Sequence, residues 1–141
     1  MATQVFINLP VRDVARSIAY FTGLGFTNQP KFTDENAACF QVDETIYLML
    51  LTREYFASFY DKPVADPQEA AGVYVALTRE TRDAVDELAA TAVAAGGTEA
   101  REAIDMGFMY QRSVADPDGN IFEFFWMDPA AVEAGPPDMA A

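Results

Sequence analysis

The chain contains an internal repeat, which constrains its fold more than any other feature. The segment DETIYLMLL at 43–51 matches DGNIFEFFW at 118–126 position for position, and the Arg-Asp pair at 12–13 matches the Arg-Glu pair at 79–80. Each copy predicts the same order of elements, a strand, a helix and a pair of strands. One copy alone leaves a face of its sheet exposed, so we expect the two copies to pack or pair around a shared core.

Apolar periodicity sets the bounds of these elements. Alternating β-formers predict strands, and apolar residues at helical spacing after Asp13 predict a helix with that residue as its N-cap. Residues 116–119 predict the turn of the last hairpin. The expected strands are 4–9, 37–42, 45–51, 73–78, 107–115 and 120–127, and the expected helices fall within 12–26 and 80–97.

The length of 141 residues and the hydrophobic content of 51% suit one domain with a sizeable core. The connector between the copies carries several charges, and we expect its Phe56, Phe59 and Tyr60 to anchor it to the body. The expected organisation is a single domain over 1–141, with a first module at about 4–52, a connector at about 53–71, a second module at about 72–127 and a flexible tail at 128–141.

The net charge of −13 excludes several classes of partner. Nucleic acids and anionic membrane surfaces require a positive patch, which this acidic chain does not offer. No apolar stretch approaches the roughly 20 residues needed to span a bilayer, and the first residues lack a signal-peptide pattern. Cys39 is the only cysteine, so it forms no intrachain disulfide and is expected in the core. We therefore expect a cytoplasmic protein that binds neither nucleic acid nor membranes.

The absence of histidine limits the chemistry of the chain. Zinc and iron sites usually contain imidazole, and so does most acid–base catalysis near neutral pH. The sequence also lacks a Ser-His-Asp or Cys-His arrangement, a glycine-rich phosphate loop and a CxxC pair. The ordinary signatures of catalysis are therefore missing.

Three stretches resemble a known family. They are NLPVRDVARSIAYFTGLGF at 8–26, AVDELAATAVAAGG at 84–97 and RSVADPDGNIFEF at 112–124. With the repeat, they make residues 4–127 similar to the vicinal oxygen chelate superfamily, which includes glyoxalase I, extradiol dioxygenases, fosfomycin resistance enzymes and bleomycin resistance proteins. This resemblance implies an α+β fold of two tandem βαβββ modules whose curved sheets enclose a cleft.

The resemblance also implies where a metal would be held. In metal-dependent members the ligands come from the first and last strand of each half, and the matching positions here are Phe6, Leu48, Val73 and Glu123. Phenylalanine, leucine and valine side chains cannot coordinate a cation, and a single carboxylate does not hold a divalent metal. We therefore expect a protein with no metal and no cofactor.

Glu123 is the one position of the four that stays polar. An ionised carboxylate among apolar neighbours is costly unless it is paired. We expect Arg112, on the preceding strand, as its partner, whereas a change of register by one residue would substitute Gln111 or Ser113. Glu123 is then a member of a structural pair, a catalytic proton-transfer group or a contact to a bound ligand. We favour the ligand contact.

Other side chains are expected to line the same cleft. Asn8 lies two residues after Phe6, hence on the same face of the strand, and offers an amide. Tyr110 suits stacking against a flat ligand, and Phe125 shares the strand face of Glu123. The candidate ligand-binding residues are Phe6, Asn8, Leu48, Val73, Tyr110, Arg112, Glu123 and Phe125.

The favoured interpretation is a protein that binds a small, partly aromatic molecule without a metal, in the manner of the bleomycin resistance members. The alternative is an enzyme. It would be a metal-independent lyase or isomerase with Glu123 as base, such as a lactoylglutathione-lyase-like enzyme, or a metal-dependent lyase, isomerase or dioxygenase with ligands elsewhere. The small size of each half, together with the resemblance, also predicts a homodimer.

Overall fold

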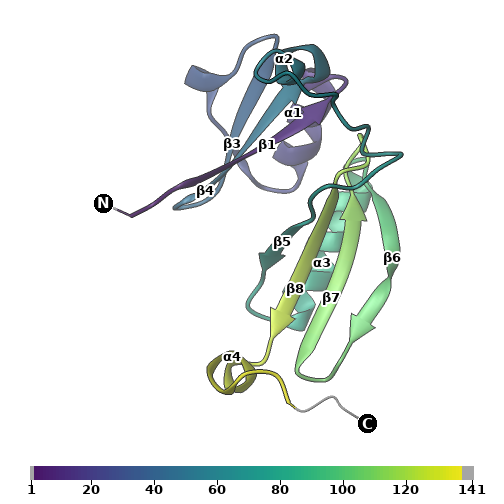
Figure 1. The fold of residues 1–141 in the computed structure, drawn as a ribbon. Coiled ribbons are helices and arrows are strands. Elements are labelled where there is room, and N and C mark those ends of the chain that lie inside the picture. Colours follow the sequence, from purple (N-terminus) through teal and green to yellow (C-terminus); the bar gives the residue numbers. More distant parts are fainter. Residues whose placement is uncertain (1, 138–141) are drawn as a thin grey trace. The chain divides into compact units, whose positions relative to one another are not determined.

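The computed structural model describes residues 2–137, which divide into two compact units (Figure 1). Unit 1 comprises the described residues up to Gly72 together with the turn Pro117–Asn120. Unit 2 comprises Val73–Asp116 and the described residues from Ile121 onward. The strands form two sheets of four strands each, and helices accompany both. The predicted α+β fold of two repeated modules is confirmed.

Unit 1 folds as a strand, a helix and three strands, followed by a short helix. The strands lie in the order β1-β4-β3-β2, with β1 parallel to β4 and the other neighbours antiparallel. Its elements are β1 (Val5–Val11), α1 (Val14–Gly23), β2 (Thr27–Asn28), the 3-10 helix η1 (Pro30–Phe32), β3 (Ala37–Asp43), β4 (Ile46–Thr52) and α2 (Arg53–Ala57).

Helix α1 covers one face of the unit 1 sheet. As predicted, Asp13 caps the helix, and its carboxylate accepts a hydrogen bond from the backbone N–H of Arg16 at 3.2 Å. Phe21 on α1 contacts Phe40 on β3, with ring centroids 5.9 Å apart. Phe40 pairs with Leu48 on β4, so both lie on the α1 face of the sheet. Because side chains alternate along a strand, their neighbours point to the opposite face.

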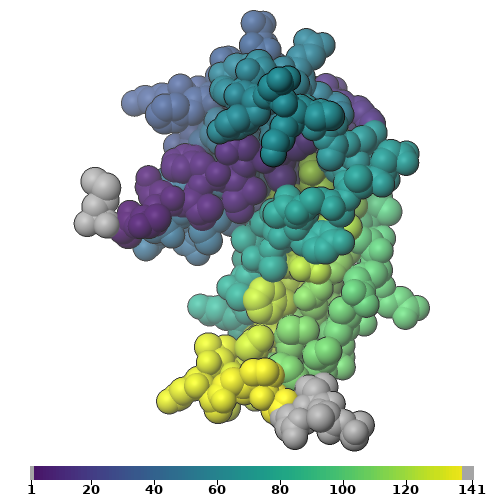
Figure 2. Space-filling model, viewed as in Figure 1, coloured from purple at the N-terminus to yellow at the C-terminus, as the bar shows by residue number. Residues whose placement is uncertain are grey.

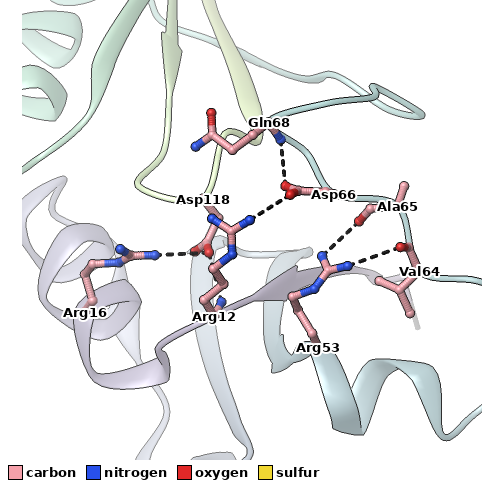
Figure 3. A network of polar contacts seen from close by, with 8 residues as sticks. All are labelled: Arg12, Arg16, Arg53, Val64, Ala65, Asp66, Gln68 and Asp118. Atoms are coloured by element: carbon pink, nitrogen blue, oxygen red, sulfur yellow. Dashed lines mark hydrogen bonds and ion pairs between the residues drawn. The ribbon is translucent and has the colours of Figure 1, made fainter.

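A polar network fixes the connector and the 117–120 turn within unit 1 (Figure 3). Buried Asp118 accepts hydrogen bonds from the backbone N–H of Arg12 at 2.8 Å and from the Arg16 guanidinium at 3.1 Å. The Arg12 guanidinium also pairs with Asp66 at 2.7 Å. Arg53, at the start of α2, donates to the carbonyl oxygens of residues 64 and 65. These bonds attach the connector to the ends of β1 and β4.

Unit 2 repeats the arrangement of unit 1. Its strands lie in the order β5-β8-β7-β6, again with the first pair parallel and the others antiparallel, and α3 runs along the sheet (Figure 1). The elements are β5 (Val75–Thr78), α3 (Arg82–Ala94), β6 (Thr98–Asp105), β7 (Met109–Ala115), β8 (Ile121–Met127) and α4 (Pro129–Ala134).

The core of unit 2 lies between α3 and its sheet. Thr81 caps the helix, and its hydroxyl accepts a hydrogen bond from the backbone N–H of Ala84 at 3.0 Å. The residues of α3 and of the facing strands that are buried here are Val75, Leu77, Val85, Leu88, Ala89, Ala92, Val114, Phe122 and Phe124. No helix within residues 2–137 has both the length and the apolar character needed to cross a membrane.

Several elements go beyond the sequence-based expectation. The β6 sequence, TEAREAID, is dominated by charged residues and alanine, so its strand state depends on pairing with β7 rather than on propensity. Helix α2 lies in the connector, where Phe59 and Tyr60 are exposed instead of buried. Helix α4 lies in the segment 128–141, which the sequence predicts to be flexible. Residues 138–141 of that segment lie outside the described residues.

Candidate functional site

Glu123 lies on the face of the unit 2 sheet that is opposite α3. We call this surface the open face of unit 2. Glu123 pairs with Ala76 on β5 and with Ser113 on β7, and Phe125 lies on the same face, as predicted. Within β5, β7 and β8, only Glu123 brings a charge to this face. The open face of unit 2 includes Ala76, Thr78, Gln111, Ser113, Glu123 and Phe125.

Gln111 is the side chain that binds Glu123. Its amide Nε2 donates a hydrogen bond to Glu123 Oε2 at 3.1 Å and lies 3.3 Å from Ser113 Oγ. Gln111 is two residues from Ser113 along β7, so the contact to Glu123 runs diagonally across the strand pair. The carboxylate is half-buried, and its partner here is a neutral amide rather than a cation.

The prediction that Arg112 pairs with Glu123 is wrong. Arg112 lies opposite Phe124 in the register and therefore faces α3. Its guanidinium binds Asp86 on α3 at 2.8 Å and Glu99 on β6 at 3.1 Å. The difference arises because the turn sets Ser113, and not Arg112, across from Glu123, and a shift of one residue reverses the face of every side chain.

Tyr110 also lies on the α3 face, away from Glu123. Its hydroxyl donates a hydrogen bond to Asp86 at 2.5 Å. This hydrogen bond, together with one from Arg112, lowers the pKa of the Asp86 carboxyl, and the same bond raises the pKa of Tyr110. Arg82 extends the cluster, because its guanidinium stands 5.3 Å from the centroid of the Tyr110 ring. Tyr110 and Arg112 thus belong to a structural cluster between α3 and the sheet.

Arg101 is a functional candidate that the sequence analysis missed. It pairs with Ser113 on β7, which in turn pairs with Glu123, so the three residues form one row across β6, β7 and β8. Arg101 is exposed and forms no ion pair with any of residues 2–137. The row places a carboxylate, a hydroxyl and a guanidinium at successive strands, which lie about 4.8 Å apart in a sheet. No sequence signal marks this position, since β6 lacks the pattern of a strand.

The structure changes the correspondence between the two copies by one residue. The helix caps Asp13 and Thr81 match, so Phe6 corresponds to Tyr74 rather than to Val73. Val73 itself lies before β5 and is 57% exposed. Leu48 is fully buried on the α1 face, where the second copy has Phe122, so the counterpart of Glu123 is Met49.

The corrected positions of the family's metal site are Phe6, Met49, Tyr74 and Glu123. A phenylalanine, a tyrosine, a methionine and one glutamate do not make a set of hard oxygen and nitrogen ligands. Within residues 2–137, no three His, Cys, Asp or Glu side chains gather in a way that would hold a metal ion. Cys39 is buried, and burial raises the pKa of its thiol, which disfavours the thiolate that binds metals. The side chains at these four positions therefore do not fit the metal of the family.

Phe6 and Asn8 lie together on unit 1, as predicted. Both are on the face of the sheet opposite α1, where Phe6 stacks on Tyr47 with ring centroids 4.5 Å apart. The amide of Asn8 donates a hydrogen bond to the carbonyl oxygen of Phe6 at 3.2 Å. Asn8 also lines a pocket of about 390 Å³, whose other lining residues are Leu51, Phe56, Phe59 and Tyr60.

Comparisons with known proteins agree with this architecture. A model of the Glyoxalase/Bleomycin resistance protein/Dioxygenase superfamily matches residues 3–124. No curated protein sequence matches the chain. Among solved structures, hypothetical protein SA1046 from S. aureus is similar at 25% identity with a TM-score of 0.75, over 89% of this chain and 95% of that one.

Two further structures show the same fold at lower identity. One is a glyoxalase/bleomycin resistance protein/dioxygenase family enzyme from Burkholderia phytofirmans PsJN, at 20% identity and a TM-score of 0.73, over 89% of this chain and 99% of that one. The other is the fosfomycin resistance protein FosX from Mesorhizobium loti, at 13% identity and a TM-score of 0.68, over 94% of this chain and 98% of that one. These likenesses concern the fold.

Proposed function

This chain belongs to the Glyoxalase/Bleomycin resistance protein/Dioxygenase superfamily, and we propose that within it the protein binds a small, partly aromatic molecule without a metal. One observation carries the proposal. Of the positions that correspond to the family's metal ligands, only Glu123 is an ordinary metal-ligand side chain, and its nearest polar partner is the neutral amide of Gln111. A lone carboxylate held in this way suits a hydrogen-bond acceptor for a ligand better than an ion-binding site.

The open face of unit 2 supplies the contacts that such a ligand needs. Phe125 offers a ring beside the Glu123 carboxylate, and Ser113 offers a hydroxyl between Glu123 and Arg101. A molecule with a hydrogen-bond donor at one end and an acceptor or anionic group about 10 Å away would reach both charges, given the spacing of strands. Ligand pockets commonly combine such an apolar surface with a few placed polar groups.

A screen by thermal shift tests the proposal. The wild-type protein, Glu123→Gln and the control Glu102→Gln, which changes an exposed carboxylate next to Arg101 on the same strand, are melted against a panel of metabolites and antibiotics. We expect at least one compound to raise the melting temperature of the wild type and of the control. Its affinity should fall at least about tenfold in Glu123→Gln, equivalent to about 1.4 kcal/mol. A panel without any stabilising compound would argue against binding.

Metal analysis separates the binding protein from an enzyme. We expect no stabilisation when nickel, zinc, manganese or iron is added to the purified protein, and no stoichiometric metal in it. Near-stoichiometric metal, or a clear rise in melting temperature with one of these ions, would favour a metal-dependent lyase, isomerase or dioxygenase instead. Turnover of a stabilising compound that is lost in Glu123→Gln would favour the metal-independent enzyme with Glu123 as base.

We also propose that the protein is a homodimer. β1 and β5 are edge strands, each paired on one side only within its sheet. Large apolar side chains at or beside them are exposed, namely Val5, Phe6, Val73 and Tyr74. Exposed apolar groups along an unpaired strand edge favour association with another copy of the chain.

A further inference from the structure

The pocket of unit 1 that Asn8 lines is distinct from the open face of unit 2 and has the dimensions of a small-molecule pocket. Its volume of about 390 Å³ lies within the range of roughly 300 to 1,000 Å³ that is usual for ligand sites. Asn8 and Leu51 come from the sheet face opposite α1, and the remaining lining residues come from α2 and the residues after it. Figure 2 shows the teal α2 segment beside purple β1 on the surface of unit 1.

The wall formed by α2 is anchored at the N-terminal end of the helix and braced by a ring contact further along. The hydroxyl of Thr52 caps the helix by accepting a hydrogen bond from the backbone N–H of Tyr55 at 3.2 Å. Arg53 donates to two carbonyl oxygens of the connector, at 3.0 and 3.2 Å. The ring of Tyr55 meets the ring of Phe59 edge to face, with centroids 4.9 Å apart. Phe59 is therefore presented by a supported segment, which lowers the entropy that a ligand must overcome on binding.

Two aromatic rings at the pocket are largely exposed to solvent, so their exposed area contributes no stability to the fold by burial. Phe59 is 52% exposed and Tyr60 is 81% exposed, although both line the pocket. A flat molecule in the pocket would cover part of both rings and stack against them. Aromatic contacts of this kind add to the stabilisation that comes from burying apolar area.

The polar lining defines the chemistry of the ligand. Asn8 and Tyr60 are the only lining residues with polar side-chain atoms, and none of the lining residues is charged. A charged ligand would lose its hydration without a partner, so an uncharged ring is favoured. The amide Nδ2 of Asn8 already donates to the Phe6 carbonyl, which leaves Oδ1 as an acceptor. A ring N–H would match that acceptor.

We propose that this pocket, built from Asn8, Leu51, Phe56, Phe59 and Tyr60, binds an uncharged planar aromatic molecule that carries a ring N–H donor. The site uses residues of unit 1 alone. It goes beyond the function proposed for Glu123, because it requires neither that carboxylate nor the open face of unit 2.

Indole is a suitable probe, with 1-methylindole as the analogue that lacks the N–H. Both are titrated into the isotopically labelled full chain and followed by NMR. We expect saturable shifts of the Asn8 side-chain amide and of the Tyr60 ring signals with indole. Affinity for 1-methylindole should be about three- to tenfold weaker, the range that corresponds to one net hydrogen bond. This preference should disappear in Asn8→Leu, which keeps the approximate shape of the side chain and removes the acceptor.

Two variants remove the rings without removing buried structure. Phe59→Ser and Tyr60→Ser are each expected to weaken indole binding at least about fivefold, as the loss of a stacking contact implies. Phe32→Ser is the matched control, because Phe32 is an exposed aromatic residue of unit 1, at 69%, that does not line the pocket. It should leave indole affinity unchanged. Melting curves of all variants should show that the fold is retained.

Several results would overturn this assignment. They are the absence of saturable shifts at Asn8 and Tyr60, equal weakening by Phe32→Ser, or equal affinity for the two probes. Glu123→Gln separates the two proposals, since it should leave indole binding unchanged. If Glu123→Gln weakened indole as much as Phe59→Ser does, the pocket would not be an independent site. If indole still binds but no compound binds the open face of unit 2, only the function proposed for Glu123 is contradicted.

Discussion

The amide of Gln111 donates a hydrogen bond to the carboxylate of Glu123 across the β7–β8 pair, at 3.1 Å. Gln111 is uncharged, so it supplies no cation to pair with this carboxylate, which lies on a half-buried face. The Arg112 guanidinium, which would have neutralised that charge, binds Asp86 and Glu99 on the other side of the sheet. This arrangement leaves Glu123 with unused acceptor capacity for a ligand.

Glu123→Gln is expected to leave stability equal or slightly higher. The substitution removes the carboxylate without leaving a cation unpaired, because the partner is the neutral amide of Gln111. That amide can also form a hydrogen bond to glutamine. The free energy of unfolding should change by less than about 1 kcal/mol. Urea unfolding at pH 7 measures this change. Loss of a charge partner would instead cost about 3 to 5 kcal/mol in a buried pair, so a large drop in stability with ligand affinity intact would refute the functional role of Glu123.

Arg112 should be coupled energetically to Asp86 and not to Glu123. A double-mutant cycle with Arg112→Met and Asp86→Asn should give a coupling energy of about 0.5 to 2 kcal/mol, reduced by solvent because the pair is partly exposed. The cycle of Arg112→Met with Glu123→Gln should be additive within about 0.5 kcal/mol. Chemical denaturation of the single and double variants supplies both values. Strong coupling in the second cycle would contradict the observed register of β7 and β8.

Acid should remove the contribution of Asp105 to stability. A hydrogen bond from Arg82, and a second from the backbone N–H of Gly107, lower the pKa of the Asp105 carboxyl from 3.8 to about 2. A folded-state pKa below the ordinary value stabilises the protein above about pH 4, and this contribution is lost as the pH falls towards 2. Because the pair is exposed, we expect a small effect. The wild type should exceed Asp105→Asn in stability at pH 6, and the difference should shrink at pH 3. A difference that grows on acidification would contradict this sign.

Gly119→Ala should destabilise the protein more than Gly25→Ala. Both glycines have positive φ angles, of +101° and +92°, so each alanine incurs backbone strain of about 1 to 2 kcal/mol. At Gly119 the new Cβ would also lie 3.0 Å from backbone atoms of Pro67 and Gln68, whereas at Gly25 it would meet nothing within 4 Å. The free energies of unfolding of the two variants are measured in urea. The difference between their losses gives the cost of the contact with the connector. Equal costs would mean that the connector moves away freely.

The proposed homodimer predicts the mass of two chains in solution. Sedimentation velocity or light scattering at micromolar concentration measures it directly. Dilution should lower the melting temperature, because dissociation removes the stabilisation that a partner provides. The mass of a single chain at micromolar concentration would exclude the dimer.

The sequence by itself determined the repeat, the α+β class and the helix that Asp13 caps. These features depend on local physics, namely periodicity, β-propensity and capping, which are readable along the chain. It also placed Phe6 with Asn8 on one strand face, and Phe125 with Glu123 on another, because alternation within a single strand needs no partner.

Tertiary structure alone decided which strands face one another and in which register. The contact of Gln111 with Glu123, the burial of Leu48 and the row that includes Arg101 all depend on alignment between strands. A shift of one residue along a strand costs little in local propensity but moves every side chain to the other face of the sheet. β6 shows the same limit, since a segment of charged residues and alanine becomes a strand only because β7 supplies its hydrogen bonds.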